Sequence, residues 1–424
     1  MPQTLPGTFP AYTAFAPRVP VHCVTPGLTG FVHRYYDSSP FSPSGRYMAL
    51  TRLPFEDRLP KPGDVAEIFV VDLVGGHTRR VADTRGWDVQ LGAQLQWGAD
   101  DHSLLFNDLD VGTWQPFGVR LDPLSGERTR LDGTVYSMSP DGLWTASPCL
   151  LRMASTQRGY GVVVPRDRIP VNRGASASDG IYLTSTETGA SRLLVSIDRI
   201  VREAVPALSS ARFGKGDFFG FHVKWNPQGT RLMFVLRWLP RSWLPWKRKK
   251  SYGLKQVITM DADGGNIRVA VPAELWSQGG HHPNWCPDGD HIVMNLNSTG
   301  DGLRFTKLRY DGTGIEVLAD PVRGSGHPTM HPNGRHILSD AYTTEPVSFG
   351  DGTAPIRLID VVTRTDTALV RIRTEPLAEP ARGALRVDPH PAWDRSYSYI
   401  AFNACPEGRR QVFVADMRDV LTRT

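Results

Sequence analysis

The sequence is poor in cysteine, with four in 424 residues. These four residues are scattered along the chain without the spacing of a disulfide framework. A small scaffold held by disulfide bonds is therefore excluded, and we expect four free thiols. They are Cys23, Cys149, Cys286 and Cys405.

Long hydrophobic runs are also missing. No run of about 18 apolar residues occurs, which a membrane-spanning helix needs. The first residues, Met1 to Pro6, have neither a basic region nor an apolar stretch of the length of an export signal. We therefore expect a cytoplasmic protein without membrane association, or a secreted one if a leader has been removed.

No segment shows a long helical period, whereas glycine and proline are frequent, with 41 and 34 residues. This composition suits many short strands joined by turns. There is no Gly-x-Ser-x-Gly motif, and the pair Gly279-Gly280 lacks the strand-to-helix context of a phosphate loop. The common serine hydrolase and nucleotide-binding classes are thereby excluded. Paired carboxylates for glycoside hydrolysis stay open, because their separation in space cannot be read from the sequence.

What the sequence has instead is a short phrase that returns seven times. It consists of an aromatic residue or Met, a small or polar residue, and usually Pro-Asp-Gly or Pro-Asn-Gly. An apolar run follows most copies, and the glycine allows the positive φ of a tight turn between two strands. The seven copies occupy residues 38–45, 94–98, 135–142, 222–227, 282–289, 327–334 and 390–394.

Each copy predicts the first two strands of one propeller blade. Third strands rich in β-branched residues follow, such as 67–73 and 256–261, and then short fourth strands. We therefore predict an all-β fold, a seven-bladed β-propeller of four-stranded antiparallel blades that forms a single domain over residues 1–424. Residues 18–24 precede the first copy by the distance of a fourth strand. We predict that this strand closes the last blade from outside.

A histidine stands three positions before the aromatic residue or Met in the last four copies, at His222, His282, His327 and His390. Equivalent positions on four inner strands meet at one end of the channel, on the face that carries the long loops. Neutral imidazoles suit divalent ions, and three of them leave positions open for water or substrate. We predict that His282, His327 and His390 bind a divalent metal such as zinc, manganese or calcium. The alternative is four packed histidines that line a wet channel.

The third copy contributes a tyrosine and an arginine to the same face. Tyr136 lies where the inner strand begins, and Arg152 lies just past the second strand. Such a pair suits β-elimination on a uronic acid, because Arg neutralises the carboxylate while Tyr donates or accepts a proton. His33 and His222 are further catalytic candidates, and Gln94 is a candidate for substrate binding. The alternatives are a buried aromatic for Tyr136 and a loop-anchoring ion pair for Arg152.

Residues 237–250 pack six cations and three tryptophans into fourteen positions. Indole rings stack on sugars and cations attract carboxylates, so we predict that Trp238, Arg241 and Trp243, with Arg212, bind an acidic polysaccharide. The alternative is a surface loop or a segment that docks on a protein or membrane. Nucleic acid is not expected, because the net charge is only +5 and no domain-wide basic excess accompanies this loop.

Two resemblances follow from these motifs. The repeated Trp-x-Pro-Asp-Gly phrase resembles TolB-like propellers over most of the chain. The His-Pro pairs at 282–283 and 327–328, with Asp388-Pro389-His390-Pro391, are similar to those of oligogalacturonate lyases, propellers that hold a divalent metal through channel histidines. That resemblance implies a metal-dependent enzyme that acts on an acidic oligosaccharide.

The spacing of Tyr136 and Arg152 resembles that of the seven-bladed ulvan lyases. This resemblance implies that Tyr136 is the acid or base, that Arg152 neutralises the carboxylate, and that a rim histidine is the partner base. Gln94 stands where a histidine is expected, which is a departure from that pattern.

We therefore predict a polysaccharide or oligosaccharide lyase that cleaves beside a uronic acid by β-elimination and leaves an unsaturated uronate end. The alternative is a non-catalytic TolB-like propeller that binds a ligand or a protein. A metal-dependent hydrolase or epimerase on the same scaffold is a third interpretation.

Overall fold

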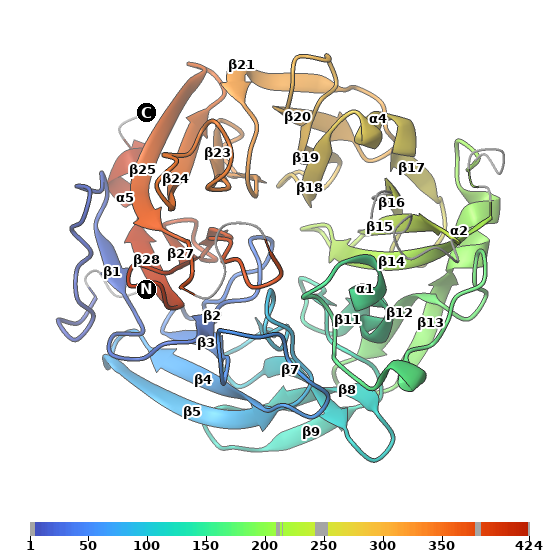
Figure 1. Cartoon of the computed structure of the whole chain (residues 1–424), viewed down its shortest axis with the longest axis horizontal. Coiled ribbons are helices and arrows are strands. Elements are labelled where there is room, and N and C mark those ends of the chain that lie inside the picture. The colour runs from blue at the N-terminus through green and yellow to red at the C-terminus, as the bar shows by residue number, and fades with distance from the viewer. Residues whose placement is uncertain (1–4, 209–212, 214, 242–252, 378–382, 423–424) are drawn as a thin grey trace.

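The computed structural model describes residues 5–208, 213, 215–241, 253–377 and 383–422. Seven four-stranded sheets stand in a ring around a central channel, and the first strand of each consecutive set lies innermost (Figure 1). All pairs within the sheets are antiparallel, as in β3 with β4 and in β27 with β28. The predicted all-β, seven-bladed propeller is thus confirmed.

In each of the first four blades, the strands follow one another in sequence order from the channel outward. Blade one holds β2 (Phe31–Val32), β3 (Tyr47–Arg52), β4 (Ala66–Asp72) and β5 (His77–Thr84), and blade two holds β6 (Gln96–Trp97), β7 (Leu104–Asp110), β8 (Gln115–Leu121) and β9 (Arg128–Leu131). Blade three holds β10 (Ser137–Met138), β11 (Trp144–Ser147), β12 (Gly180–Ser185) and β13 (Ser191–Ser196), and blade four holds β14 (Gly216–Trp225), β15 (Arg231–Pro240), β16 (Leu254–Asp261) and β17 (Arg268–Val271).

The remaining blades follow the same order, and short helices lie in the connections. Blade five holds β18 (Gly280–Trp285), β19 (His291–Leu296), β20 (Arg304–Arg309) and β21 (Glu316–Arg323), and blade six holds β22 (Thr329–Met330), β23 (His336–Ser339), β24 (Thr353–Asp360) and β25 (Thr365–Arg373). Blade seven holds β26 (Ala392–Trp393), β27 (Tyr399–Ala404), β28 (Gln411–Asp416) and, outermost, β1 (Val21–Cys23). The helices are α1 (Leu150–Thr156), a 3₁₀ turn (Arg166–Arg168), α2 (Ile197–Glu203), α4 (Ala273–Ser277) and α5 (Arg418–Thr422).

The ring is closed by the two ends of the chain. Strand β1 pairs with β28, with Val21 opposite Ala415 and Cys23 opposite Phe413. The predicted closing strand at residues 18–24 is confirmed, with regular pairing over its central three residues. This pairing ties the two ends of the chain together, because the N-terminal strand is the outermost strand of the C-terminal sheet.

The repeated phrase builds the contacts between neighbouring blades. Trp97 and Trp285 are buried, and each donates its indole N–H to a backbone oxygen of the preceding blade, Trp97 to Pro40 at 2.9 Å and Trp285 to Lys224 at 3.2 Å. The turn that follows takes a glycine with positive φ, which is 70° at Gly289. One phrase therefore supplies both a hairpin turn and a hydrogen bond between blades.

The two ends of the channel differ in what they carry. We call the face with the connections between second and third strands the loop face, and the face with the Pro-Asp-Gly turns the turn face. The connection of blade three is the longest of these and contains α1. The connection of blade two is short, because β7 runs on to Asp110 and β8 begins at Gln115.

The inner strand of blade one is interrupted by a loop that fills the channel. Phe31 and Val32 pair with Arg52 and Thr51, and pairing resumes where Phe41 meets Met48. Residues 33–40 therefore stand opposite only two residues of β3 and bulge inward. We call residues 33–40 the channel loop. The channel loop carries His33. This residue precedes the first copy of the repeated phrase in the sequence, and the structure places it within the interrupted inner strand of blade one.

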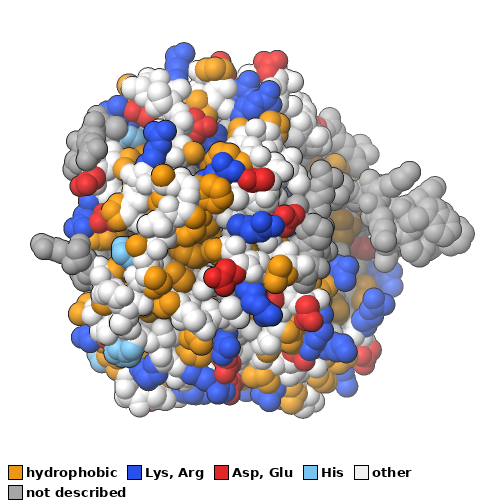
Figure 2. Space-filling model, turned by 60° about the vertical axis from the view of Figure 1, so that its left-hand side comes forward, with side chains coloured by type: hydrophobic (Ala, Val, Ile, Leu, Met, Phe, Trp, Pro, Cys, Tyr) orange, Lys and Arg blue, Asp and Glu red, His pale blue; other side chains and the backbone are white. Residues whose placement is uncertain are grey.

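One face of the molecule carries side chains of both charges. In the view of Figure 2, Lys and Arg side chains alternate with Asp and Glu around a band of hydrophobic side chains. All four cysteines are free, as predicted. Among the described residues, no helix has the length and hydrophobicity needed to cross a membrane.

Candidate functional site

The structure brings the four predicted histidines together around the channel loop. The ring of His327 lies 3.9 Å from that of His282 and 4.3 Å from that of His390, between ring centroids. Tyr35 of the channel loop separates these three from His222, since its ring lies 5.3 Å from His222 and 4.6 Å from His390. The histidines therefore form a group of three and a single ring on the other side of Tyr35.

An uncommon backbone conformation places two of these side chains. His282 and His390 have φ of 57° and 49°, and Gln94, at the equivalent place in blade two, has φ of 62°. Residues other than glycine adopt such angles rarely. Three of the repeats thus share a kink where the inner strand begins, and the sequence pattern gave no sign of it.

Three buried side chains could hold a metal ion together. The ligand atoms of His327, Asp388 and His390 all lie within 4.8 Å of one another. Among the described residues, neither ring nitrogen of His390 has a hydrogen-bond partner, although the side chain is buried. Orphaned nitrogens are costly unless a ligand occupies them, so the donor set fits a divalent ion that accepts imidazole and carboxylate.

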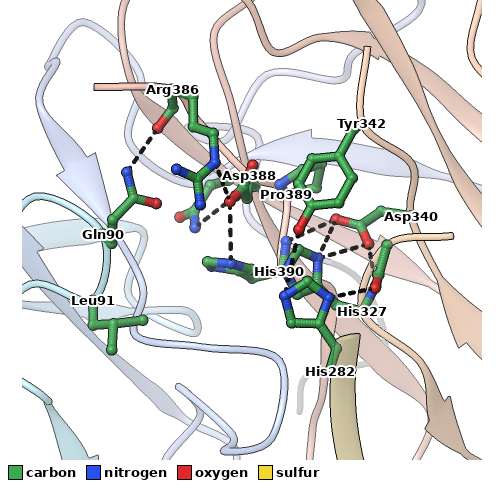
Figure 3. Close-up of polar contacts among 12 residues, drawn as sticks. Gln90, Leu91, His282, His327, Asp340, Tyr342, Arg386, Asp388, Pro389 and His390 are labelled. Atoms are coloured by element: carbon green, nitrogen blue, oxygen red, sulfur yellow. Dashed lines mark hydrogen bonds and ion pairs between the residues drawn. The ribbon is translucent and has the colours of Figure 1, made fainter. Parts of the chain in front are cut away.

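Neighbouring side chains orient two of these ligands (Figure 3). Asp340 accepts from Nδ1 of His327 at 2.9 Å, which leaves Nε2 of His327 for a metal. Arg386 donates from Nε to Asp388 at 3.0 Å. A carboxylate behind a histidine and a cation behind a carboxylate are the usual supports of metal ligands.

His282 was predicted as a metal ligand but is not one of the three residues of this triad. Its Nδ1 lies 2.8 Å from the backbone oxygen of Gly326, and its Nε2 lies 3.4 Å from the hydroxyl of Tyr342. Asp388 occupies the third position of the triad instead. The sequence carried the signal for this, because Asp388 stands two residues before His390 in the Asp-Pro-His-Pro motif.

Burial keeps three of these histidines neutral. Desolvation lowers the pKa of His222, His282 and His390 well below the usual 6.5. For His390 the neighbouring His327 and His33 act in the same direction. Metal binding requires unprotonated imidazole. Protons therefore compete little with a metal ion for these rings at neutral pH.

Acid is expected to destabilise the metal-free protein through His33. Burial lowers the pKa of His33 to about 4, whereas an unfolded histidine titrates near 6.5. The part of the stability that depends on His33 is therefore complete above about pH 6.5 and falls by about 3 kcal/mol as the pH drops toward 4, because only the unfolded chain binds that proton there. Urea unfolding of metal-free protein across this range measures the loss.

The matched variants are His33→Gln and, for exposed His77, His77→Gln. His33→Gln should show a shallower decline of the unfolding free energy with falling pH, and His77→Gln should follow the wild type. Equal slopes for all three proteins would contradict the assignment.

Tyr136 and His222 form a buried pair beneath Tyr35. The hydroxyl of Tyr136 is hydrogen bonded to Nδ1 of His222, and the Tyr136 side chain is fully buried. Burial raises the pKa of Tyr136 well above 10, so its phenol is protonated at neutral pH. The guanidinium of Arg34 lies over the same ring, 4.9 Å from its centroid.

Arg152 lies in a different network from Tyr136. It belongs to α1, is buried, and faces Asp179 with 3.5 Å between Nη1 and Oδ1. Gln94 is also engaged, because its Oε1 accepts from Nε of Arg34 at 2.9 Å. The structure therefore gives Arg152 an acidic partner and makes Gln94 a support of Arg34.

Arg34 and Asp37 of the channel loop form a buried charge cluster with Lys224 of β14, which the sequence did not indicate. Asp37 lies 2.8 Å from Arg34 and 3.0 Å from Lys224, and all three side chains are at most 6 % exposed. Lys224 also donates to the hydroxyl of Tyr36 at 3.0 Å. This cluster holds Tyr36 in the channel and faces the cavity on the turn face.

The two described residues of the predicted sugar-binding segment, Trp238 and Arg241, contact groups other than the histidines. Trp238 packs on Phe213, with 5.9 Å between ring centroids, and stands against Gly216. Arg241 is exposed and pairs with Asp217. Arg212 and Trp243 lie outside the described residues. Side chains alternate along β15, so the neighbours of Trp238, not Trp238 itself, face the pocket described next.

A basic pocket of about 510 Å³ opens on the loop face beside the triad of His327, Asp388 and His390. Its lining includes no acidic side chain among the described residues. Tyr342 links it to His282, and Arg386 links it to Asp388. The pocket is lined by Thr156, Gln157, Arg158, Arg237, Leu239, Gly253, Lys255, Tyr342 and Arg386.

Comparisons with known proteins bear on the fold. No family model matches the chain. The oligogalacturonate lyase in complex with manganese superimposes with a TM-score of 0.63 at 13% identity, over 96% of each chain. The chain has the propeller fold of that lyase. An oligogalacturonate lyase from Vibrio parahaemolyticus gives 0.61 at 13% identity, over 98% of this chain and 97% of that one.

A sequence relative covers only part of the chain. The uncharacterized protein Atu1656 of Agrobacterium fabrum is 27% identical over 115 residues, which is 25% of this chain and 38% of that protein. The chain therefore spans well under half the length of this relative. At these identities the solved structures establish the propeller fold, and the chemistry has to come from the site itself.

Proposed function

We propose that the protein is a metal-dependent lyase that cleaves an acidic oligosaccharide or polysaccharide beside a uronic acid by β-elimination. The observation that carries this proposal is the position of a basic pocket, whose described lining has no acidic side chain, beside the buried triad of His327, Asp388 and His390. The shared fold with a lyase that binds manganese supports it. Manganese or another divalent ion is the proposed cofactor.

The charges of the pocket suit a carboxylated sugar. Arg158, Arg237, Lys255 and Arg386 reach the same 510 Å³ space, and cations of this kind bind carboxylates through charge-assisted hydrogen bonds. Arg237 and Arg386 take the role that the sequence gave to Arg152, whose guanidinium faces Asp179. Binding the uronate carboxylate in this field stabilises the negative charge that develops when the C5 proton leaves.

A bound divalent ion would add Lewis acidity at the carboxylate of the substrate. The chain holds the ligands for it, since Asp340 orients His327 and Arg386 orients Asp388. Tyr136 and His222 stay a proposed proton-transfer pair on the far side of Tyr35, and His33 a proposed catalytic group. Tyr136→Phe with full turnover would remove Tyr136 from that role.

The direct test is incubation with a panel of uronate polymers and oligomers, with manganese supplied. The expected result is a rise in ultraviolet absorbance from the conjugated, unsaturated uronate end, which chelation abolishes and manganese restores. No rise on any substrate, together with binding of an acidic oligosaccharide in calorimetry, would instead support the binding-module alternative.

Replacement of Arg386 should impair catalysis through the metal site. Arg386→Met removes the partner of Asp388 and one cation of the pocket, and we expect kcat/KM to fall about 10- to 100-fold, the usual cost of losing an outer partner of a metal ligand. Arg373→Met is the control, because Arg373 ends β25 and pairs with Glu375 at 3.6 Å, outside the pocket. Equal kcat/KM in both variants would contradict the role of Arg386.

A further inference from the structure

Two cations stand directly opposite each other in the wall of the basic pocket. Lys255 of β16 is paired across the sheet with Arg237 of β15. Like charges at such positions destabilise a sheet, and the structure shows no acidic side chain bonded to either among the described residues. The fold tolerates an uncompensated charge pair here, which is typical of functional sites rather than structural ones.

The two cations are not equivalent. Arg237 is held in place, because it donates to Gln157 at 2.8 Å and lies over the ring of Phe221 at 3.4 Å. The amine of Lys255 has no hydrogen-bond or ion-pair partner among the described residues, and only the ring of Trp276 lies near it, at 5.9 Å. Lys255 thus presents a free amine to the pocket.

The surroundings of Lys255 favour its neutral form. Burial, and then the charge of Arg237, lower the pKa of Lys255 to about 8. The groups that face it are Arg237 from β15, His281 from β18 and Trp276 from α4, with Arg158, Tyr342 and Arg386 around the same pocket. None of these carries a negative charge that would hold the proton on the amine.

We propose that Lys255 is the base that removes the C5 proton of the uronate. This inference rests on the proposed lyase function. The lone pair of Nζ takes the proton, the C5–H electron pair becomes the C4–C5 double bond, and the C4–O bond breaks. The leaving oxygen takes up a proton from water in the pocket, and Lys255 later returns its proton to solvent.

The other titratable groups of the pocket are less suited to this role. Arginine stays charged at neutral pH and cannot accept a proton, and Arg386 is further bound to Asp388. Burial raises the pKa of Tyr342 well above 10, which keeps its phenol protonated. A lysine with a lowered pKa is a familiar general base, because its amine is unprotonated near working pH.

Two measurements on the full-length protein test the proposal. In the first, acylation of Lys255 by a lysine-specific reagent is followed by mass spectrometry across pH. The labelling should titrate near pH 8, well below the 10.4 of an ordinary lysine. This readout needs neither substrate nor metal. Labelling that titrates like exposed Lys61 in the same sample would overturn the inference.

The second measurement is steady-state lyase kinetics with manganese and the substrate found by the panel. Lys255→Met should lower kcat about 10²- to 10⁴-fold, the usual contribution of a general base, with KM little changed. The wild-type kcat/KM should rise with pH through about 8 and then level off. Lys255→Arg should lack this rise, because arginine stays protonated. Lys215→Met, an exposed lysine of the same blade outside the pocket lining, should behave as wild type.

The outcomes separate this inference from the function on which it rests. An active wild type with an equally active Lys255→Met would remove Lys255 as the base and leave the lyase proposal intact. A wild type that forms no unsaturated product from any uronate substrate would overturn both. A folded but inactive Lys255→Met that still binds substrate and metal would support the assignment.

Discussion

Replacing His390 with alanine should abolish metal binding and lower lyase activity by more than about 100-fold. The side chain is buried, and its two ring nitrogens have no hydrogen-bond partner in the part of the chain that the structure describes. It lies within 4.8 Å of the ligand atoms of His327 and Asp388, so its loss leaves two ligands of three. Loss of an outer partner alone commonly costs 10- to 100-fold, and loss of a ligand costs more.

Metal analysis of the purified variant and its kcat/KM with manganese in excess measure this result. The matched control is His331→Ala, because His331 is a histidine of the turn face that packs on Trp393 with 5.3 Å between ring centroids. His331→Ala should keep the metal content of the wild type. Unchanged metal in His390→Ala would show that the triad is a set of packed histidines and a carboxylate.

Replacing Asp37 with asparagine should lower the free energy of unfolding by about 3–5 kcal/mol. Asp37 is the only carboxylate that the structure shows between Arg34 and Lys224, at 2.8 and 3.0 Å, and all three are buried. Burial by itself would raise the pKa of Asp37, but Lys224 and Arg34 outweigh it and lower that pKa below its usual value. The residue is therefore ionised at neutral pH, and its removal leaves two buried cations without compensation.

Chemical denaturation at neutral pH checks this prediction against a surface pair. Asp83 pairs with Arg80 at exposures of 46% and 51%, so Asp83→Asn should cost less than about 1 kcal/mol. The double variant Asp37→Asn with Lys224→Met should recover part of the loss, because one unpaired cation is gone. A loss no larger than that of Asp83→Asn would mean that water already screens the cluster.

The predicted metal ligands show which features of a site the positions within the repeats can predict. Register across the copies identified His327 and His390 correctly as neighbours, because equivalent positions of closed blades meet on one rim. The sequence prediction included His282 and not Asp388, because it considered only histidines. The ring of His282 does lie 3.9 Å from that of His327, yet its nitrogens face Gly326 and Tyr342. Which neighbour supplies a ligand depends on side-chain direction, and the kinked backbone at His282 sets that direction.

The predicted substrate-binding residues show that the local composition of a segment does not identify the residues that line a pocket. The tryptophans and cations at 237–250 stood out in the sequence, but Trp238 packs on Phe213 and Arg241 pairs with Asp217. The basic pocket uses Arg237 and Lys255, single cations in two ordinary strands, with Arg158 and Arg386 from distant connections. No local pattern marks such residues, because each is typical of its own strand or loop.

The sequence by itself determined the seven blades, their four strands and the closing strand, because hydrophobic alternation and turn glycines are local properties that repeat. It also determined which histidines share a rim. Only the tertiary structure decided that residues 33–40 fill the channel, that Asp388 joins the histidines, and that four cations meet in one pocket. These features depend on distances between residues hundreds of positions apart, and ring closure sets those distances.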